Sequence, residues 1–145
     1  MKGAIVLSFV FIGVWFVACS KSSSPSDPPI NPIDSDPNES VIDSTVNGTT
    51  VSYLVSQRFR LELILQFDAG YQWDYTMSDT NAVCLDSTSY RPASGNYNQV
   101  GGAAIESFHF RAIHAGTCNL RLFEHRGWES NIAPIDTVSF VVAVS

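Results

Sequence analysis

The chain has 145 residues, a formal net charge of −6 and 45% hydrophobic residues. When two N-terminal segments are set aside, about 105 residues remain, which is enough for one modest hydrophobic core. The acidic balance and the scattered arginines argue against nucleic-acid binding, because a nucleic-acid site needs a basic patch.

Residues 1–18 have the pattern of an export signal. Lys2 precedes the apolar run GAIVLSFVFIGVWFVA, which ends at the small residue Ala18, directly before Cys19. The sequence FVAC resembles the bacterial lipobox, with Phe16 in place of the usual leucine. This resemblance implies that Cys19 is lipidated and becomes the first residue of the mature protein. An uncleaved anchor and an ordinary signal peptide are the alternatives.

Residues 19–40 are rich in Ser, Pro and Asp and predict a disordered tether. Ile30 and Ile33 are almost the only apolar residues of this segment, so it cannot bury enough surface to offset the entropy of ordering. Its prolines keep the chain semi-extended. With a lipid on Cys19, we expect an exported protein attached to a bacterial membrane, on the periplasmic or cell-surface face. Residues 41–145 are then the folded domain.

From residue 51 onward, apolar and polar residues alternate, which indicates half-buried β-strands. The clearest run, RFRLELILQF, places five apolar side chains on one face: Phe59, Leu61, Leu63, Leu65 and Phe67. Four other runs do the same with Val51, Tyr53 and Val55, with Phe108, Phe110 and Ala112, with Cys118, Leu120 and Leu122, and with Val138, Phe140, Val142 and Val144. Weaker strands are predicted over 71–75, 82–85 and 87–91.

Glycine-containing turns separate these runs, and no helical period is evident outside the export signal. About seven or eight short strands without intervening helices predict an all-β fold, an antiparallel β-sandwich.

The two tryptophans of the predicted domain have different surroundings. Trp73 alternates in phase with Tyr71 and Tyr75, which predicts that it packs between the sheets. Trp128 lies in the turn HRGWES, directly after Gly127. An exposed aromatic residue on a loop is a candidate for recognition, and a lid over the end of the sandwich is the alternative.

No motif of an enzyme is present, neither a G-x-S-x-G elbow nor a glycine-rich phosphate loop, and we expect no catalytic activity and no cofactor. His109 and His114 differ in parity and would face opposite sides of a strand. With His125 in a separate turn, the three histidines predict no metal site. Cys84 and Cys118 are either a disulfide of an exported protein or two buried free thiols.

Three segments, taken in order, resemble the binding loops of the chagasin family of inhibitors of papain-like cysteine peptidases. The similarity runs from about residue 45 to the C-terminus. QFDAGYQW keeps Gly70, Tyr71 and Trp73 of the first family loop, N-P-T-T-G and the aromatic residues after it. VGGAAIESFHF aligns with the second loop and its F-x-F strand, with Ala103 and Ala104 in place of a glycine pair.

The third loop of the family reads R-P-W, and here RGW supplies Arg126 and Trp128, with Gly127 for proline. The resemblance implies an immunoglobulin-like sandwich whose three loops form a wedge that enters the peptidase cleft, with Trp128 giving flat apolar area and Arg126 a fork of donors. The peptidase-binding residues that it implies are Phe67, Asp68, Ala69, Gly70, Tyr71, Gly101, Gly102, Ala103, Arg126, Gly127 and Trp128.

Several functions are compatible with this sequence. The first is a reversible, occluding inhibitor that acts as a monomer; the substituted first loop is compatible with altered specificity or with an inactive relative. The second is an adhesion or glycan-binding module on a surface lipoprotein, in which Trp128 with Asn131, or Tyr97 with Asn98, contacts a sugar. The third is a periplasmic scaffold protein that the lipid only positions.

Overall fold

The computed structural model describes residues 37–66, 69–97, 102–129 and 131–145. The predicted export signal, the lipidation site Cys19 and most of the predicted tether lie outside these ranges. Within the described residues, no helix is long and apolar enough to cross a membrane.

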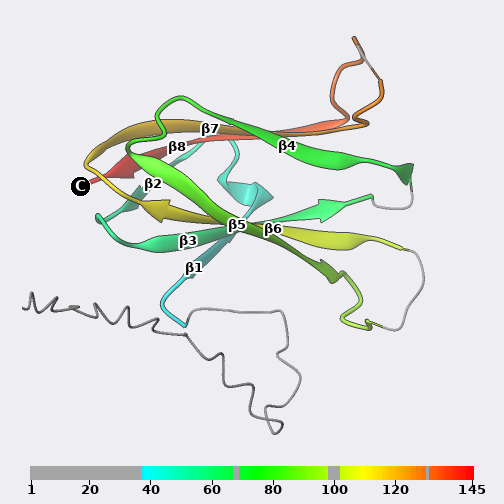
Figure 1. Cartoon of the computed structure of the whole chain (residues 1–145), viewed down its shortest axis with the longest axis horizontal. Coiled ribbons are helices and arrows are strands. Elements are labelled where there is room, and N and C mark those ends of the chain that lie inside the picture. Colours follow the sequence, from blue (N-terminus) through cyan, green and yellow to red (C-terminus); the bar gives the residue numbers. More distant parts are fainter. Residues whose placement is uncertain (1–36, 67–68, 98–101, 130) are drawn as a thin grey trace, which may run out of the picture. The chain divides into compact units, whose positions relative to one another are not determined.

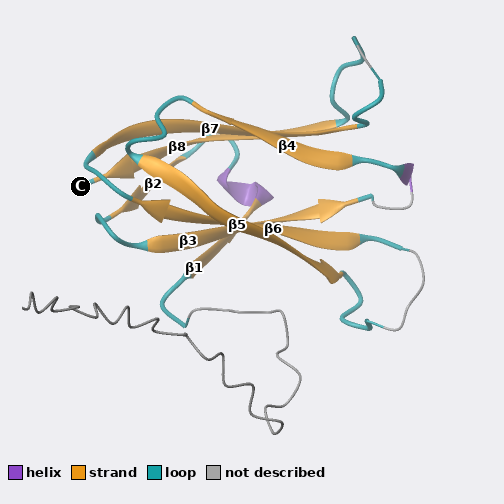
Figure 2. Ribbon diagram, in the orientation of Figure 1, coloured by secondary structure: helices purple, strands orange, loops and turns teal. Residues whose placement is uncertain are grey.

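The described part of the chain is almost entirely β-structure (Figures 1 and 2). Its strands are β1 (Ser40–Asp43), β2 (Thr50–Tyr53), β3 (Arg58–Leu65), β4 (Gln72–Met77), β5 (Val83–Pro92), β6 (Ala104–Ala112), β7 (Gly116–His125) and β8 (Asp136–Val144). One short 3-10 helix, η1 (Ser44–Val46), follows β1.

The strands form two four-stranded sheets, ordered β1-β3-β6-β5 and β2-β8-β7-β4. The expectation of an all-β sandwich is confirmed. Four of the six neighbouring strand pairs are antiparallel, as predicted, but β1 pairs parallel to β3 and β2 pairs parallel to β8. η1 carries the chain from one sheet to the other, so β1 and β2 do not form a hairpin, and each lies at the edge of a different sheet. Asp43 begins this crossing, because its Oδ1 accepts the Thr45 N–H at 2.9 Å.

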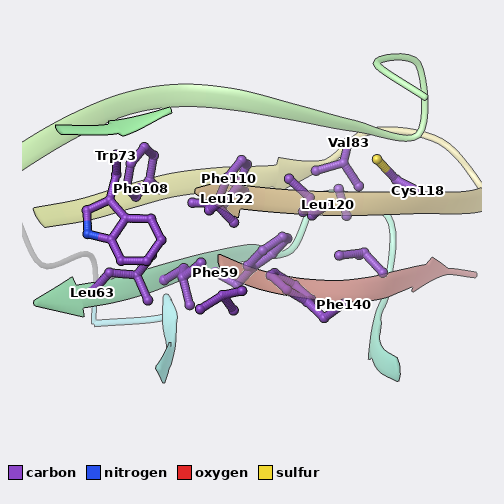
Figure 3. Close-up of a cluster of buried hydrophobic side chains, with 14 of the residues drawn as sticks. Phe59, Leu63, Trp73, Val83, Phe108, Phe110, Cys118, Leu120, Leu122 and Phe140 are labelled. Atoms are coloured by element: carbon purple, nitrogen blue, oxygen red, sulfur yellow. The ribbon is translucent and has the colours of Figure 1, made fainter. Parts of the chain in front are cut away.

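The alternating apolar residues form the core between the sheets (Figure 3). Side chains predicted to point inward are buried: Phe59, Leu61, Leu63, Leu65, Phe108, Phe110, Ala112, Cys118, Leu120, Leu122, Val138, Phe140, Val142 and Val144. Trp73 joins them and donates its indole N–H to the Ile64 carbonyl at 3.0 Å. The prediction for Trp73 is therefore confirmed. Val55 differs, because β2 ends at Tyr53 and leaves Val55 exposed in the following turn.

The two weak strands predicted over 82–85 and 87–91 are a single strand, β5, with a shift in register between Leu85 and Ser87. Such an irregularity bends a strand and interrupts its alternation, which is why the sequence reads as two pieces. Asp86, at the shift, accepts a hydrogen bond from Arg111 at 2.8 Å.

Cys84 and Cys118 are free thiols in the structure. Cys118 is buried in the core, whereas Cys84 is half-buried near Asp86, with 3.4 Å between its Sγ and the aspartate Oδ1. The structure thus agrees with the free-thiol alternative and not with the disulfide, although only one of the two thiols is buried.

The folded structure includes the last residues of the segment that was predicted as tether. β1 begins at Ser40, and the carboxylate of Glu39 is almost completely buried. Glu39 lies 3.0 Å from His109 Nδ1 and 3.3 Å from Arg60 Nη1. The two basic side chains that hold this glutamate are distant from it in the sequence. Local composition therefore could not predict that Glu39 belongs to the folded domain.

Candidate functional site: three loops at one end of the sandwich

Three loops lie at the same end of the sandwich, on the right in Figure 1. They are the first loop, between β3 and β4 (66–71), the second, between β5 and β6 (93–103), and the third, between β7 and β8 (126–135). Strand register fixes this arrangement, because Leu65 pairs with Ala104 in one sheet and Gln72 pairs with His125 in the other.

Most of the predicted binding residues can be placed at this end. Phe67, Asp68 and Gly101 lie outside the described residues. Those that the structure describes are in the three loops: Ala69, Gly70, Tyr71, Gly102, Ala103, Arg126, Gly127 and Trp128.

Trp128 packs against the first loop and remains 69% exposed. The six-membered ring of its indole lies over Gly70, so that a Cβ added to Gly70 would overlap the ring. Gly70 has φ +71°, a conformation that glycine adopts without steric cost. Trp128 is therefore neither a free side chain nor a buried lid, because one part touches Gly70 while most of it faces solvent.

Arg126 fastens the third loop to the first. Its Nε donates to the Ala69 carbonyl at 3.0 Å, and its guanidinium lies 4.5 Å from the centre of the Tyr71 ring. Its Nη1 is 3.1 Å from Glu129 Oε1. The donors that the family resemblance assigns to a partner are thus partly engaged within the protein.

Gly127 stands where the family has proline, and the neighbouring strand explains why a small residue fits. A Cβ at Gly127 would lie 3.1 Å from Gln72 Oε1, a tight contact. Gln72 is itself held by a hydrogen bond from its Nε2 to Asp74 at 3.2 Å. The glycine gives the third loop room to lie beside β4.

Beneath these loops lies Glu124, a buried carboxylate that the sequence analysis did not single out. It is 4% exposed and accepts the Gln66 N–H, at the start of the first loop, at 3.1 Å. Its backbone carbonyl accepts the Ile135 N–H, at the end of the third loop, at 2.9 Å. Glu124 therefore joins the bases of the two loops.

Glu106 is a second buried carboxylate, 3% exposed, and it accepts a hydrogen bond from the Tyr90 hydroxyl at 2.7 Å. Burial raises the pKa of Glu106, hydrogen bonds from Tyr90 and the Trp73 backbone oppose the rise, and the charges of Asp74 and Glu124 add to it. Burial and the same Glu106 carboxylate raise the pKa of Tyr90 to about 12.

The burial of both carboxylates could have been predicted from the alternation of inward and outward positions along their strands. Glu124 continues the inward series of Cys118, Leu120 and Leu122, and Glu106 occupies the inward position before Phe108.

The sequence matches the family model described as chagasin family peptidase inhibitor I42 over residues 54–143. The chain belongs to the chagasin family. Members of this family are inhibitors and not enzymes, which confirms the expectation that the chain has no catalytic activity. The family also supports inhibition of cysteine proteases as the function of this protein.

Two solved structures resemble this chagasin-family domain. The cysteine protease inhibitor EhICP2 from Entamoeba histolytica matches with a TM-score of 0.66 and 17% identity, over 74% of this chain and 96% of that one. Amebosin matches with a TM-score of 0.62 and 16% identity, over 75% of this chain and 99% of that one. At such identities the likeness shows the fold, an immunoglobulin-like sandwich. Compared with proteins of curated function, the sequence matches none.

The second loop of this chagasin-family domain has its own bracing. The Ala93 N–H donates to the Ala103 carbonyl at 2.9 Å, and the Gly95 N–H donates to the Pro92 carbonyl at the same distance. Gly102, two residues before β6 begins, has φ +104°, a conformation that glycine adopts without steric cost.

The three histidines of the chagasin-family domain are dispersed, each with a partner of its own. His109 bonds Glu39 and Ser89, His114 bonds the Asn81 carbonyl, and His125 bonds Asp74. Over the described ranges, no group of three or more His, Cys, Asp or Glu side chains is placed to hold a metal ion.

Proposed function

We propose that this chain is a reversible inhibitor of papain-like cysteine peptidases that blocks the active-site cleft with the three loops. The observation that carries the proposal is the contact between the first and third loops. Trp128 lies on Gly70 while most of its indole stays exposed, and Arg126 is bonded to Ala69. Exposed apolar area is therefore held in one arrangement before any partner binds.

Prior ordering of the loops favours affinity, because ordered loops lose little conformational entropy on docking. A papain-like cleft is a groove with a thiolate–imidazolium pair at its floor. Occlusion of that groove excludes substrate without any bond being made or broken. The proposed contact residues are those that the resemblance implies, and the interlocked Gly70, Arg126 and Trp128 are their centre.

The proposed setting is a lipid-anchored, exported protein, tethered through Cys19 to the periplasmic or cell-surface face of a bacterial membrane. One feature of the domain suits this setting. β1 begins beside the start of β3, at Ser40 and Phe59, whereas the three loops lie beyond the other end of β3. A tether that joins the domain at Ser40 would leave the loops facing away from the attachment point.

Titration of a papain-like peptidase tests the function directly. The full-length chain, purified in mild detergent, is added to papain and to a panel of cathepsins while hydrolysis of a small substrate is followed. Stoichiometric loss of activity that excess substrate relieves is the expected result. Full activity across the panel, together with binding on a glycan array, would instead favour the sugar-binding alternative.

A further inference from the structure

A groove runs along the outer face of β7 beside the third loop. It has a volume of about 320 Å³ and is lined by Arg121, Phe123, His125, Ile132 and Pro134. A smaller hollow of about 60 Å³ shares His125 and Ile132 and is also lined by Tyr71 and Arg126. The groove is therefore continuous with the residues that interlock the first and third loops.

On its loop side this groove is lined by two apolar residues, Ile132 and Pro134. Ile132 is 61% exposed, and Ile135 and Trp128, which lie on the same loop but outside the groove, are exposed as well. Single exposed apolar residues are ordinary, but a cluster beside an aromatic floor is typical of a contact surface. Asn131, with φ +69°, turns the chain directly before Ile132.

Arg121 sets the charge of the groove. Its guanidinium lies 5.8 Å from the centre of the Phe123 ring, and within the described residues no carboxylate is close enough to pair with it. The other arginines of the domain differ, because each has an acidic partner: Arg58, Arg60, Arg91, Arg111 and Arg126. The acidic residue of the neighbouring strand β4, Asp74, is already bonded to Gln72 and His125.

We propose that this groove is a second contact site for the target peptidase, outside the active-site cleft. It takes a surface segment in which a carboxylate lies next to an apolar side chain. The carboxylate pairs with Arg121, whose fork of donors suits it, and the apolar side chain packs between Phe123 and Ile132. The inference rests on the proposed function, since it extends the same complex along the side of the third loop.

The test measures the dissociation constants of full-length variants with the peptidase of the panel that wild type inhibits most tightly. Arg121→Glu should weaken binding about tenfold at roughly 0.05 M salt, and less at roughly 0.5 M, because salt screens an exposed charge pair. Ile132→Ser should weaken binding severalfold at both salt concentrations, as expected for a lost apolar contact.

Two controls lie at the opposite end of the sandwich. Leu54→Ser removes a side chain with the same atoms and nearly the same exposure, 59% against 61%. Arg58→Glu makes the same change in net charge as Arg121→Glu. Both should bind like wild type.

The outcomes separate the two proposals. If Trp128→Ala weakens binding while Arg121→Glu and Ile132→Ser bind like wild type, the second site is wrong and the proposed function stands. If wild type inhibits no enzyme of the panel, the function fails and the second site with it. If wild type is a dimer, and Arg121→Glu dissociates that dimer while leaving the affinity for the peptidase unchanged, the groove binds a second copy of the chain and the inference is overturned.

Discussion

Trp73 and Trp128 are the same type of residue in two regions of the molecule, the core and the end of the sandwich that carries the three loops. Trp73 is 5% exposed, packs between the sheets and has a partner for its indole N–H. Trp128 is 69% exposed and contacts Gly70. Both are held in place, but only Trp73 is removed from water.

The difference separates stability from binding. Apolar area removed from water stabilises the fold, whereas apolar area that is held in place and left in water is available to a partner. The loop end gains its order from a few specific contacts and not from burial: Gly70 with Trp128, and Arg126 with Ala69. Mutations at the two tryptophans should therefore affect different measurements.

The largest effect is expected in the core. Trp73→Ala should lower the free energy of unfolding by about 3–5 kcal/mol, because it leaves a cavity and an unpaired Ile64 carbonyl. Denaturant unfolding followed by circular dichroism measures this change. Trp73→Phe, which keeps most of the volume, should cost less. A loss below about 1 kcal/mol for the alanine variant would mean that the interior tolerates removal of the indole.

Gly70→Val acts on the contact between the loops. The added side chain would displace the indole of Trp128 and would strain the backbone at φ +71°. We expect affinity for the peptidase to fall by about 2–3 kcal/mol, with a smaller loss of folding stability. Affinity is measured by inhibition kinetics and stability by denaturant unfolding.

The matched control for Gly70→Val is Gly48→Val. Gly48 has φ +75° and nothing within 4 Å of an added Cβ, so this variant carries the backbone strain without the collision. It should lose stability and keep affinity. Equal loss of stability and affinity in Gly70→Val would argue against a role of Gly70 in binding. In a double-mutant cycle, Gly70→Val and Trp128→Ala should be non-additive, since both disrupt the same contact.

Trp128→Ala is the counterpart of Trp73→Ala. It should weaken binding by roughly 2 kcal/mol, the size of an interface hot spot, and barely change the melting temperature. Inhibition constants and a thermal melt of the same preparation give the two values. A collapse of the melting temperature would show that the indole contributes to the fold more than its exposure suggests.

Much of the fold could be predicted from sequence because most residues at the inward positions of the alternation are buried. The inward residues of β3, β6, β7 and β8 recur at every second position. Trp73 likewise occupies an inward position of β4. The parallel pairing of β1 with β3 and of β2 with β8 could not be predicted, since it is not evident from local sequence that the chain changes sheet at the three-residue η1.

The position of the three loops could be predicted, but the contacts between them could not. The resemblance to the chagasin family implied that the three loops lie at one end of the sandwich, and they do. Partners distant in the sequence escaped the prediction. Glu39 is held by His109, 70 positions away, and Arg126 by Ala69, 57 positions away. Their roles depend on which strands become neighbours, which local pattern does not encode.

Glu106 sharpens the comparison of the two regions, because it is a titratable group in the interior, next to Trp73 and beneath the loops. Burial is the largest cause that raises its pKa, and the neighbouring charges of Asp74 and Glu124 act in the same direction. Hydrogen bonds from Tyr90 and the Trp73 backbone favour the ionised form and oppose the rise.

The raised pKa gives stability a definite dependence on pH. The folded protein binds this proton more tightly than the unfolded chain does, so the stabilising contribution is complete below the unfolded pKa, roughly 4.3. It is lost as the pH rises through the folded pKa of Glu106, and each unit between the two pKa values is worth about 1.4 kcal/mol.

Glu106→Gln stays neutral at every pH, so it isolates the contribution that ionisation of Glu106 makes to stability. The difference in free energy of unfolding between wild type and the variant, measured from about pH 4 to 8, should turn against wild type as the pH rises. Tyr90→Phe removes a hydrogen bond to the ionised form, which raises the folded pKa of Glu106 further and moves the change to higher pH. A difference that is flat across this range would mean that Glu106 titrates alike in the folded and unfolded chains.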